Sequence, residues 1–163
     1  MADFNRVIER YQEFPEKFRS IMLSTASADG IPQASYAPFL MDADRNIYIY
    51  ISGLSAHTAN LKQTGRVSVL FIEDEAETKE IFARRRLTYE CVANVLPRDT
   101  AQWQPLINRF EARFGQVIGL IKGLPDFQLF QLQPQAGQFV MGFGAAYRVD
   151  ANDINNLEPR RQN

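Results

Sequence analysis

The sequence has little of the chemistry that metal and redox sites usually need: one cysteine and one histidine in 163 residues. The lone cysteine, Cys91, excludes an intramolecular disulfide and a thiolate metal cluster within one chain. The lone histidine, His57, excludes a histidine-rich metal site. Cys91 stands inside an apolar, strand-like run, and we interpret it as a buried, unreactive thiol.

Long apolar runs and a strong net charge are also missing. No stretch approaches the ~20 apolar residues of a transmembrane helix, and the charged N-terminal sequence lacks the apolar core of a signal peptide. The formal net charge is −1, so no basic face of the size needed for general nucleic-acid binding is expected. We therefore predict a cytoplasmic protein that binds neither membranes nor nucleic acids.

Hydrophobic residues make up 45% of the sequence, which predicts a packed core. Residues 4–19 have helical apolar spacing, interrupted by Pro15. Strand-like patterns then follow, the first three as a meander. The predicted strands are 21–27, 32–37, 47–51, 67–72, 86–96, 127–132, 139–141 and 145–149, with helices over 55–63 and 100–114. Strands joined by short turns, without strand–helix–strand alternation, predict an antiparallel β-barrel with flanking helices. Residues 1–149 form one domain in this interpretation, and residues 150–163 a mobile polar tail.

Three consecutive arginines, Arg84, Arg85 and Arg86, open the predicted strand 86–96. Guanidinium groups beside apolar β-structure suit a phosphate, or the carboxylates of an otherwise apolar ligand. Alternatively, they form a solvated turn that balances the acidic residues within 73–77. The residues alone leave both interpretations open.

A second candidate site lies where strand 47–51 meets the following helix. The free N–H groups at a helix N-terminus favour an anion. The hydroxyl groups of Ser52, Ser55 and Thr58 and the imidazole of His57 would add donors there. The alternative is an ordinary helix cap at Ser55 with a surface histidine.

The order of YAPF, IYIYIS and SGLSAHTANLKQTGRVSVLFIEDE resembles the pyridoxamine-phosphate-oxidase-like, FMN-binding split-barrel family. In that family a Ser-Arg-Lys-Gly-type turn begins the corresponding helix and holds the flavin phosphate. Here Ala56 stands at the arginine position and His57 at the lysine position. The turn therefore carries at most one fractional positive charge near neutral pH.

The segments FARRRLTYEC, RFGQVIG, LPDFQLFQLQP and FVMGFGAAYRV are similar to the haem-utilisation branch of that family, the HutZ and HugZ type. The resemblance spans roughly residues 18–149 and implies a split-barrel homodimer that binds haem between its subunits. In some members the haem is degraded oxidatively. Arg86 matches a basic residue near the haem, and Asp126 an acidic residue that hydrogen-bonds the proximal ligand across the dimer. His57 matches a histidine without a settled role.

The haem-binding members carry their axial histidine in the C-terminal segment, whereas residues 150–163 here contain no histidine, cysteine or methionine. Three possibilities stay open. Another residue, His57 or a tyrosine, ligates the iron; or arginines and apolar contacts alone hold haem; or the protein does something else. Arg160 and Arg161 lie near the missing ligand and can attract carboxylates without ligating iron.

Three functional hypotheses follow from these patterns. The first is a haem-binding protein, with or without haem degradation. The second is an FMN-dependent oxidoreductase that resembles pyridoxamine 5'-phosphate oxidase, and the third is a non-catalytic haem or flavin carrier. We assign no catalytic residue and no protein metal site. The candidate cofactor-binding residues are Ser52, Ser55, His57, Thr58, Arg84, Arg86 and Asp126.

Overall fold

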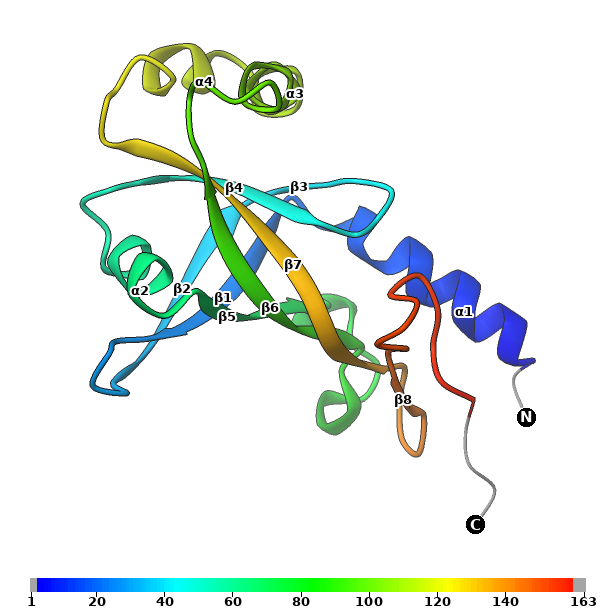
Figure 1. The fold of residues 1–163 in the computed structure, drawn as a ribbon. Helices are drawn as coiled ribbons and strands as arrows, with labels where there is room; N and C mark the ends of the chain where they lie inside the picture. The colour runs from blue at the N-terminus through cyan, green and yellow to red at the C-terminus, as the bar shows by residue number, and fades with distance from the viewer. Residues whose placement is uncertain (1–2, 160–163) are drawn as a thin grey trace.

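The computed structural model describes residues 3–159 of the chain (Figure 1). The chain begins with helix α1, Phe4–Glu13, which continues into a 3-10 turn, η1, over Phe14–Lys17. The predicted break at Pro15 is confirmed, since proline cannot extend the α-helical hydrogen bonds. Val7 and Tyr11 anchor α1 against the barrel core.

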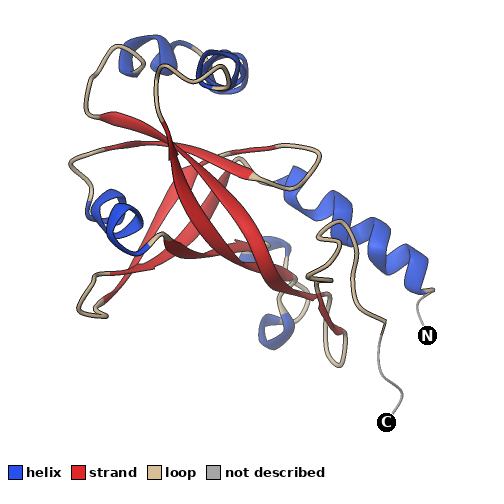
Figure 2. Cartoon of the chain, in the orientation of Figure 1, coloured by secondary structure: helices blue, strands red, loops and turns tan. Residues whose placement is uncertain are grey.

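The strands of the described chain, drawn red in Figure 2, form one antiparallel sheet. Their order is β2-β1-β5-β6-β7-β4-β3, with β8 paired to β7. β2 approaches β4 without pairing to it, so the sheet curls into a half-barrel. The predicted fold class, mainly β with flanking helices, is confirmed. The strand bounds are β1 Ser20–Ala26, β2 Pro32–Pro38, β3 Leu40–Met41, β4 Ile47–Ser52, β5 Arg66–Ile72, β6 Arg86–Leu96, β7 Phe127–Val140 and β8 Ala146–Arg148.

Two strand predictions were wrong. Segment 127–132 and residues 139–140 belong to one strand, β7, because β6 pairs with β7 along the whole length of β6. Pro134 interrupts the sequence pattern, but a bulge opposite Glu90 and Cys91 accommodates it. The prediction that the first three strands form a meander was also wrong, because β4 pairs with β7 and not with β2.

Helices cover two places on this sheet. Helix α2, Ala56–Thr64, follows β4 and ends at Gly65, whose φ of 65° is the left-handed conformation typical of a helix end. Helices α3, Trp103–Phe114, and α4, Gln116–Ile121, lie at one end of the molecule (Figure 1). Together with residues of β3, β4 and β7 they form a second apolar cluster beside the barrel core.

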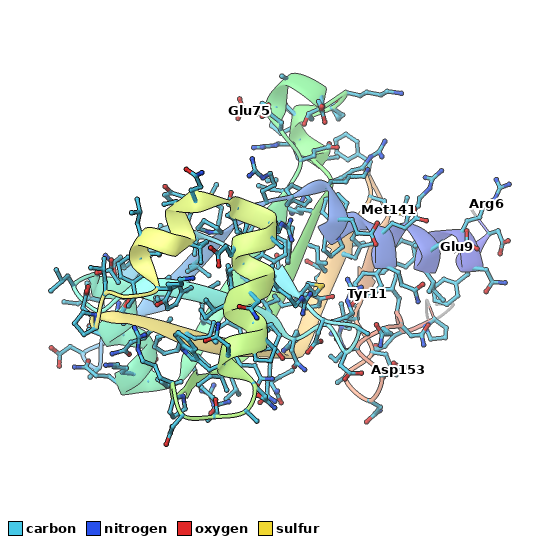
Figure 3. The ribbon with its side chains drawn as sticks, turned by 90° about the horizontal axis from the view of Figure 1, so that it is seen from above. Arg6, Glu9, Tyr11, Glu75, Met141 and Asp153 are labelled. Atoms are coloured by element: carbon cyan, nitrogen blue, oxygen red, sulfur yellow. The ribbon has the colours of Figure 1, made fainter. Side chains whose placement is uncertain are left out.

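The C-terminal segment corrects the prediction of a mobile tail for its described part, residues 150–159. Leu157 is only 3% exposed and forms a bridge with Val149. The hydroxyl of Tyr11 donates to the carbonyl of Ile154 at 2.5 Å, and Figure 3 shows Tyr11 beside the segment that carries Asp153. Arg160 and Arg161 lie outside the described residues. Within residues 3–159, no helix is long and apolar enough to cross a membrane.

Candidate functional site

The junction after β4 is held by Asp126, which lies just before β7. The Ser52 hydroxyl donates to Oδ2 of Asp126 at 2.8 Å, and the amide of Gly53 donates to the Asp126 carbonyl at 2.7 Å. A Cβ atom at position 53 would lie 2.7 Å from that carbonyl oxygen, so only glycine fits there without a backbone shift. Two of the predicted site residues, Ser52 and Asp126, are therefore in direct contact.

The hydroxyl groups at the start of α2 differ in the hydrogen bonds that they make. Ser55 is the N-cap residue, but its side chain makes no capping hydrogen bond. Thr58 is 1% exposed, and its hydroxyl donates to the Ser52 carbonyl at 2.6 Å. Thr58 therefore fixes the turn, whereas the Ser55 hydroxyl does not cap the helix.

His57 points from this turn toward β2. Its Nδ1 lies 2.9 Å from the Ser35 hydroxyl oxygen, and Nε2 has no hydrogen-bond partner within residues 3–159. Burial lowers the pKa of His57, because desolvation disfavours the charged imidazolium. The ring is therefore neutral at pH 7 and adds no full positive charge for a phosphate.

Arg98 is a residue of this region that the sequence analysis missed. Its guanidinium donates to the carbonyls of Lys122 and Leu124 at 2.9 and 2.7 Å and lies 4.9 Å from the Trp103 ring centroid. These contacts hold the loop that leads to Asp126. Nothing in the local pattern, an arginine between Pro97 and Asp99, indicated this role.

The consecutive arginines are partly neutralised by the acidic run. Arg84 donates through Nε and Nη2 to the Glu73 carbonyl and lies 3.5 Å from a Glu75 carboxylate oxygen. Arg85 pairs with Glu73 at 3.8 Å. Arg86 donates to the Arg84 carbonyl at 3.0 Å and has no carboxylate partner among the described residues. The solvated-turn interpretation therefore fits Arg84 and Arg85, and Arg86 is left as the unpaired cation.

The structure does not bring the two groups of predicted residues together within one chain. Ser52 pairs with Phe127, the first residue of β7, whereas Arg86 pairs with Val140, the last. The 14 residues of β7 span up to about 45 Å at ~3.3 Å per residue. In Figure 1, α2 and the connection between β5 and β6 accordingly lie on different sides of the barrel.

The chain folds into an antiparallel half-barrel, and a helix begins shortly after its Ser-Gly junction. This is the arrangement of a split-barrel protein. The family model described as pyridoxamine 5'-phosphate oxidase matches residues 7–141. The chain therefore belongs to this family, and the predicted resemblance is confirmed.

Within this similarity, two individual proteins match the chain, HutZ and ChuZ. The chain is 40% identical over 149 residues to the heme oxygenase HutZ of Vibrio cholerae, covering 91% of this chain and 84% of the relative. A crystal structure of Vibrio cholerae HutZ, there called a heme storage protein, matches with a TM-score of 0.77 at 37% identity, over 82% of this chain and 94% of that one. Campylobacter jejuni ChuZ matches with a TM-score of 0.84 at 31% identity, over 99% of this chain and 68% of that one.

Proposed function

We propose that the protein binds haem, as a protein of haem iron utilisation, in a cleft shared by two copies of the chain. The similarity to HutZ supports haem as the ligand. The observation that carries the two-chain site is the position of Arg86 and Ser52 at opposite ends of β7. That span exceeds the width of a porphyrin, so both groups reach one ligand only if they come from different subunits.

An exposed apolar surface supports the dimer. Met22 and Tyr36 are cross-strand partners on β1 and β2 and are 51% and 63% exposed, and Leu70 of β5 pairs with Met22 on its other side. Large apolar side chains gathered on one sheet face favour association with another surface. We propose that a second copy related by a two-fold axis covers this face.

The side chains at the two ends fit different parts of haem. Arg86 has donors left for a propionate, while Arg84 already shares its charge with the acidic run. His57 holds Nδ1 against Ser35 and keeps Nε2 available as a neutral nitrogen donor. Metal-binding histidines commonly have one ring nitrogen fixed in this way. When bound, haem would supply the redox chemistry; the residues described here bind and orient it.

FMN is the second candidate cofactor, because the chain belongs to the pyridoxamine 5'-phosphate oxidase family and the resemblance to that family implies a flavin. The helix-start turn is a poor phosphate site, however. Ala56 has no charge, His57 is neutral at pH 7, and the Thr58 hydroxyl is used internally. We therefore favour haem over the flavin, and a carrier or an oxidase that uses FMN is the less supported alternative.

Parallel titrations test this proposal. Haemin should give a stoichiometric Soret band that is weakened in Arg86→Ala and shifted in His57→Ala, while FMN fluorescence is not quenched. Arg6→Ala, an exposed arginine on α1 labelled in Figure 3, is the matched control and should bind haemin normally. Loss of the Soret band with ascorbate under oxygen would indicate haem degradation. Stoichiometric FMN quenching with an unchanged haemin spectrum, or sedimentation as a monomer, would contradict the proposal.

A further inference from the structure

Arg98, in the loop between β6 and α3, binds a second loop that is distant in the sequence. Its Nη1 donates to the carbonyl of Lys122 at 2.9 Å, and its Nη2 donates to the carbonyls of Leu124 and Phe127 at 2.7 and 3.4 Å. Residues 122–127 form the connection between α4 and β7, drawn yellow in Figure 1. One guanidinium group therefore spans this connection, from the end of α4 to the first residue of β7.

Arg98 is itself fixed by two aromatic side chains. Its guanidinium lies 4.9 Å from the ring centroid of Trp103, a residue of α3 that is 8% exposed. Its Nη2 also lies 3.4 Å from the hydroxyl oxygen of Tyr50 on β4. A planar guanidinium can stack on a ring while its edge donates to several acceptors, which the ammonium group of a lysine cannot do. Arg98 therefore ties the connection between α4 and β7 to both α3 and β4.

Asp126 is the residue that this arrangement holds in place. It stands between the two carbonyls that Nη2 of Arg98 contacts. Its own carbonyl accepts from the Gly53 amide, and its carboxylate accepts from the Ser52 hydroxyl. No cation lies within 4 Å of this carboxylate among residues 3–159. Arg98 therefore acts on Asp126 through the backbone and not through an ion pair.

The turn that Asp126 holds leads directly into α2. The Ser52 hydroxyl donates to Asp126, and the Ser52 carbonyl accepts from the Thr58 hydroxyl at 2.6 Å. His57 stands in the same first turn of α2. A continuous set of contacts therefore joins Arg98 to the turn that carries His57.

We propose that Arg98 is a positioning residue for the ligand site: it fixes Asp126, and through Asp126 the turn from which His57 reaches the haem. This inference rests on the proposed function, in which His57 and Arg86 contact the ligand. Arg98 provides no ligand atom of its own. Residues that orient a metal-binding side chain from behind commonly change metal affinity by roughly 10- to 100-fold when they are replaced.

Haemin titration of the full chain measures the effect. Arg98→Ala should weaken haemin binding about 10-fold and shift the Soret maximum, because the orientation of His57 is then less well fixed. Arg98→Lys keeps the positive charge but loses the planar guanidinium, so it should recover little of the affinity. Full recovery in Arg98→Lys would show that only the charge matters and would overturn the positioning role.

Arg113→Ala is the matched control. Arg113 also donates to a backbone carbonyl, that of Phe18 at 2.6 Å, and also lies over an aromatic ring, 5.4 Å from the Phe114 centroid. These contacts lie outside the connection between α4 and β7. Haemin affinity should therefore be unchanged in Arg113→Ala, and an equal loss in the two alanine variants would contradict a specific role for Arg98.

Hydrogen exchange of the ligand-free protein, followed by nuclear magnetic resonance, separates this inference from the proposed function. The Gly53 amide, which is bonded to the Asp126 carbonyl, should exchange about 10-fold faster in Arg98→Ala and at the wild-type rate in Arg113→Ala. Unchanged exchange in Arg98→Ala would overturn the positioning role even if haem binds. Faster exchange with unchanged haemin affinity would overturn the link to His57. A wild-type chain without a Soret band on haemin titration would instead contradict the proposed function, while faster exchange would still support the positioning of Asp126.

Discussion

The protein contains two groups of arginines that differ in how they are assembled. Arg84, Arg85 and Arg86 are consecutive in sequence, and two of them are bonded to the acidic run beside them. The second group, Arg19, Arg45, Arg109 and Arg113, is spread over most of the chain, yet no carboxylate pairs with it within the described residues. Adjacency in sequence therefore shows where charge is dense, but folding decides whether that charge is available.

The two groups also differ in what they do for the fold. Arg84 and Arg85 fix the exposed connection between β5 and β6. Arg45 instead joins three separate parts of the molecule, because it contacts α1 and β6 and because its partner Tyr11 also holds the C-terminal segment. The structure thus predicts a large stabilising role for the buried arginine and small ones for the consecutive arginines.

The largest expected effect follows from removing the buried arginine. Arg45→Ala leaves a cavity beside Tyr11 and removes donors from Tyr89 and from two carbonyls. We expect the free energy of unfolding to fall by about 3 kcal/mol. Urea denaturation monitored by circular dichroism measures this change. Arg84→Ala, the control in the consecutive group, should cost less than about 1 kcal/mol.

Arg45→Met separates packing from hydrogen bonding at the same position. Methionine retains much of the aliphatic volume but provides no donors, so we expect it to recover only part of the stability lost in Arg45→Ala. Equal losses in Arg45→Ala and Arg84→Ala would show that the two groups contribute alike and would remove the basis of the comparison.

A smaller effect is expected from releasing the consecutive arginines from their acid. Glu73→Gln retains an oxygen that can accept from the Arg85 amide but removes the charge that pairs with the Arg85 guanidinium. Stability should change by less than about 1 kcal/mol. Haemin affinity at low salt should rise roughly 2- to 5-fold, because less negative charge then faces the propionates.

The salt dependence of haemin affinity provides the control for Glu73→Gln. The gain in haemin affinity should disappear near 1 M salt, where the screening length is about 3 Å. A haemin affinity that is unchanged or lower in Glu73→Gln at low salt would indicate that the consecutive arginines do not face the ligand.

The sequence predicted most elements of the fold because their patterns are local. The break at Pro15 and the bounds of β6 were both visible in spacing and residue type. The continuous β7 was not, because Pro134 is tolerated only through a bulge set by the partner strand. The packing of residues 150–159 was missed because its apolar contacts, such as Leu157, are isolated in a polar segment.

The sequence also predicted only part of the candidate site. Ser52 and Asp126 were both candidates from the motifs and lie in contact. The sequence contained no information on their separation from Arg86, because that separation depends on the length and pairing of β7. The proximity of Arg45 and Arg113 was not predicted for a related reason: the two residues line one cavity only because the β3–β4 turn and α3 pack beside each other.

The smallest expected effect concerns His57, which lies in neither group of arginines. Burial lowers its pKa in the folded protein below the ordinary value of 6.5, and no charged group contributes to the shift. The unfolded chain therefore binds a proton more tightly than the folded protein does. The contribution of neutral His57 to stability is complete above pH 6.5 and is lost as the pH falls through the lower, folded-state pKa.

His57→Gln isolates this effect, because glutamine can still interact with the Ser35 hydroxyl but does not titrate. The difference in free energy of unfolding, wild type minus variant, should decrease from pH 7.5 to pH 5.5 in urea denaturation series. Titrating carboxylates affect both proteins alike and cancel in this difference. A difference that grows toward acid pH would instead require a negative charge facing the imidazole, whereas the Ser35 hydroxyl is the hydrogen-bond partner of the ring within residues 3–159.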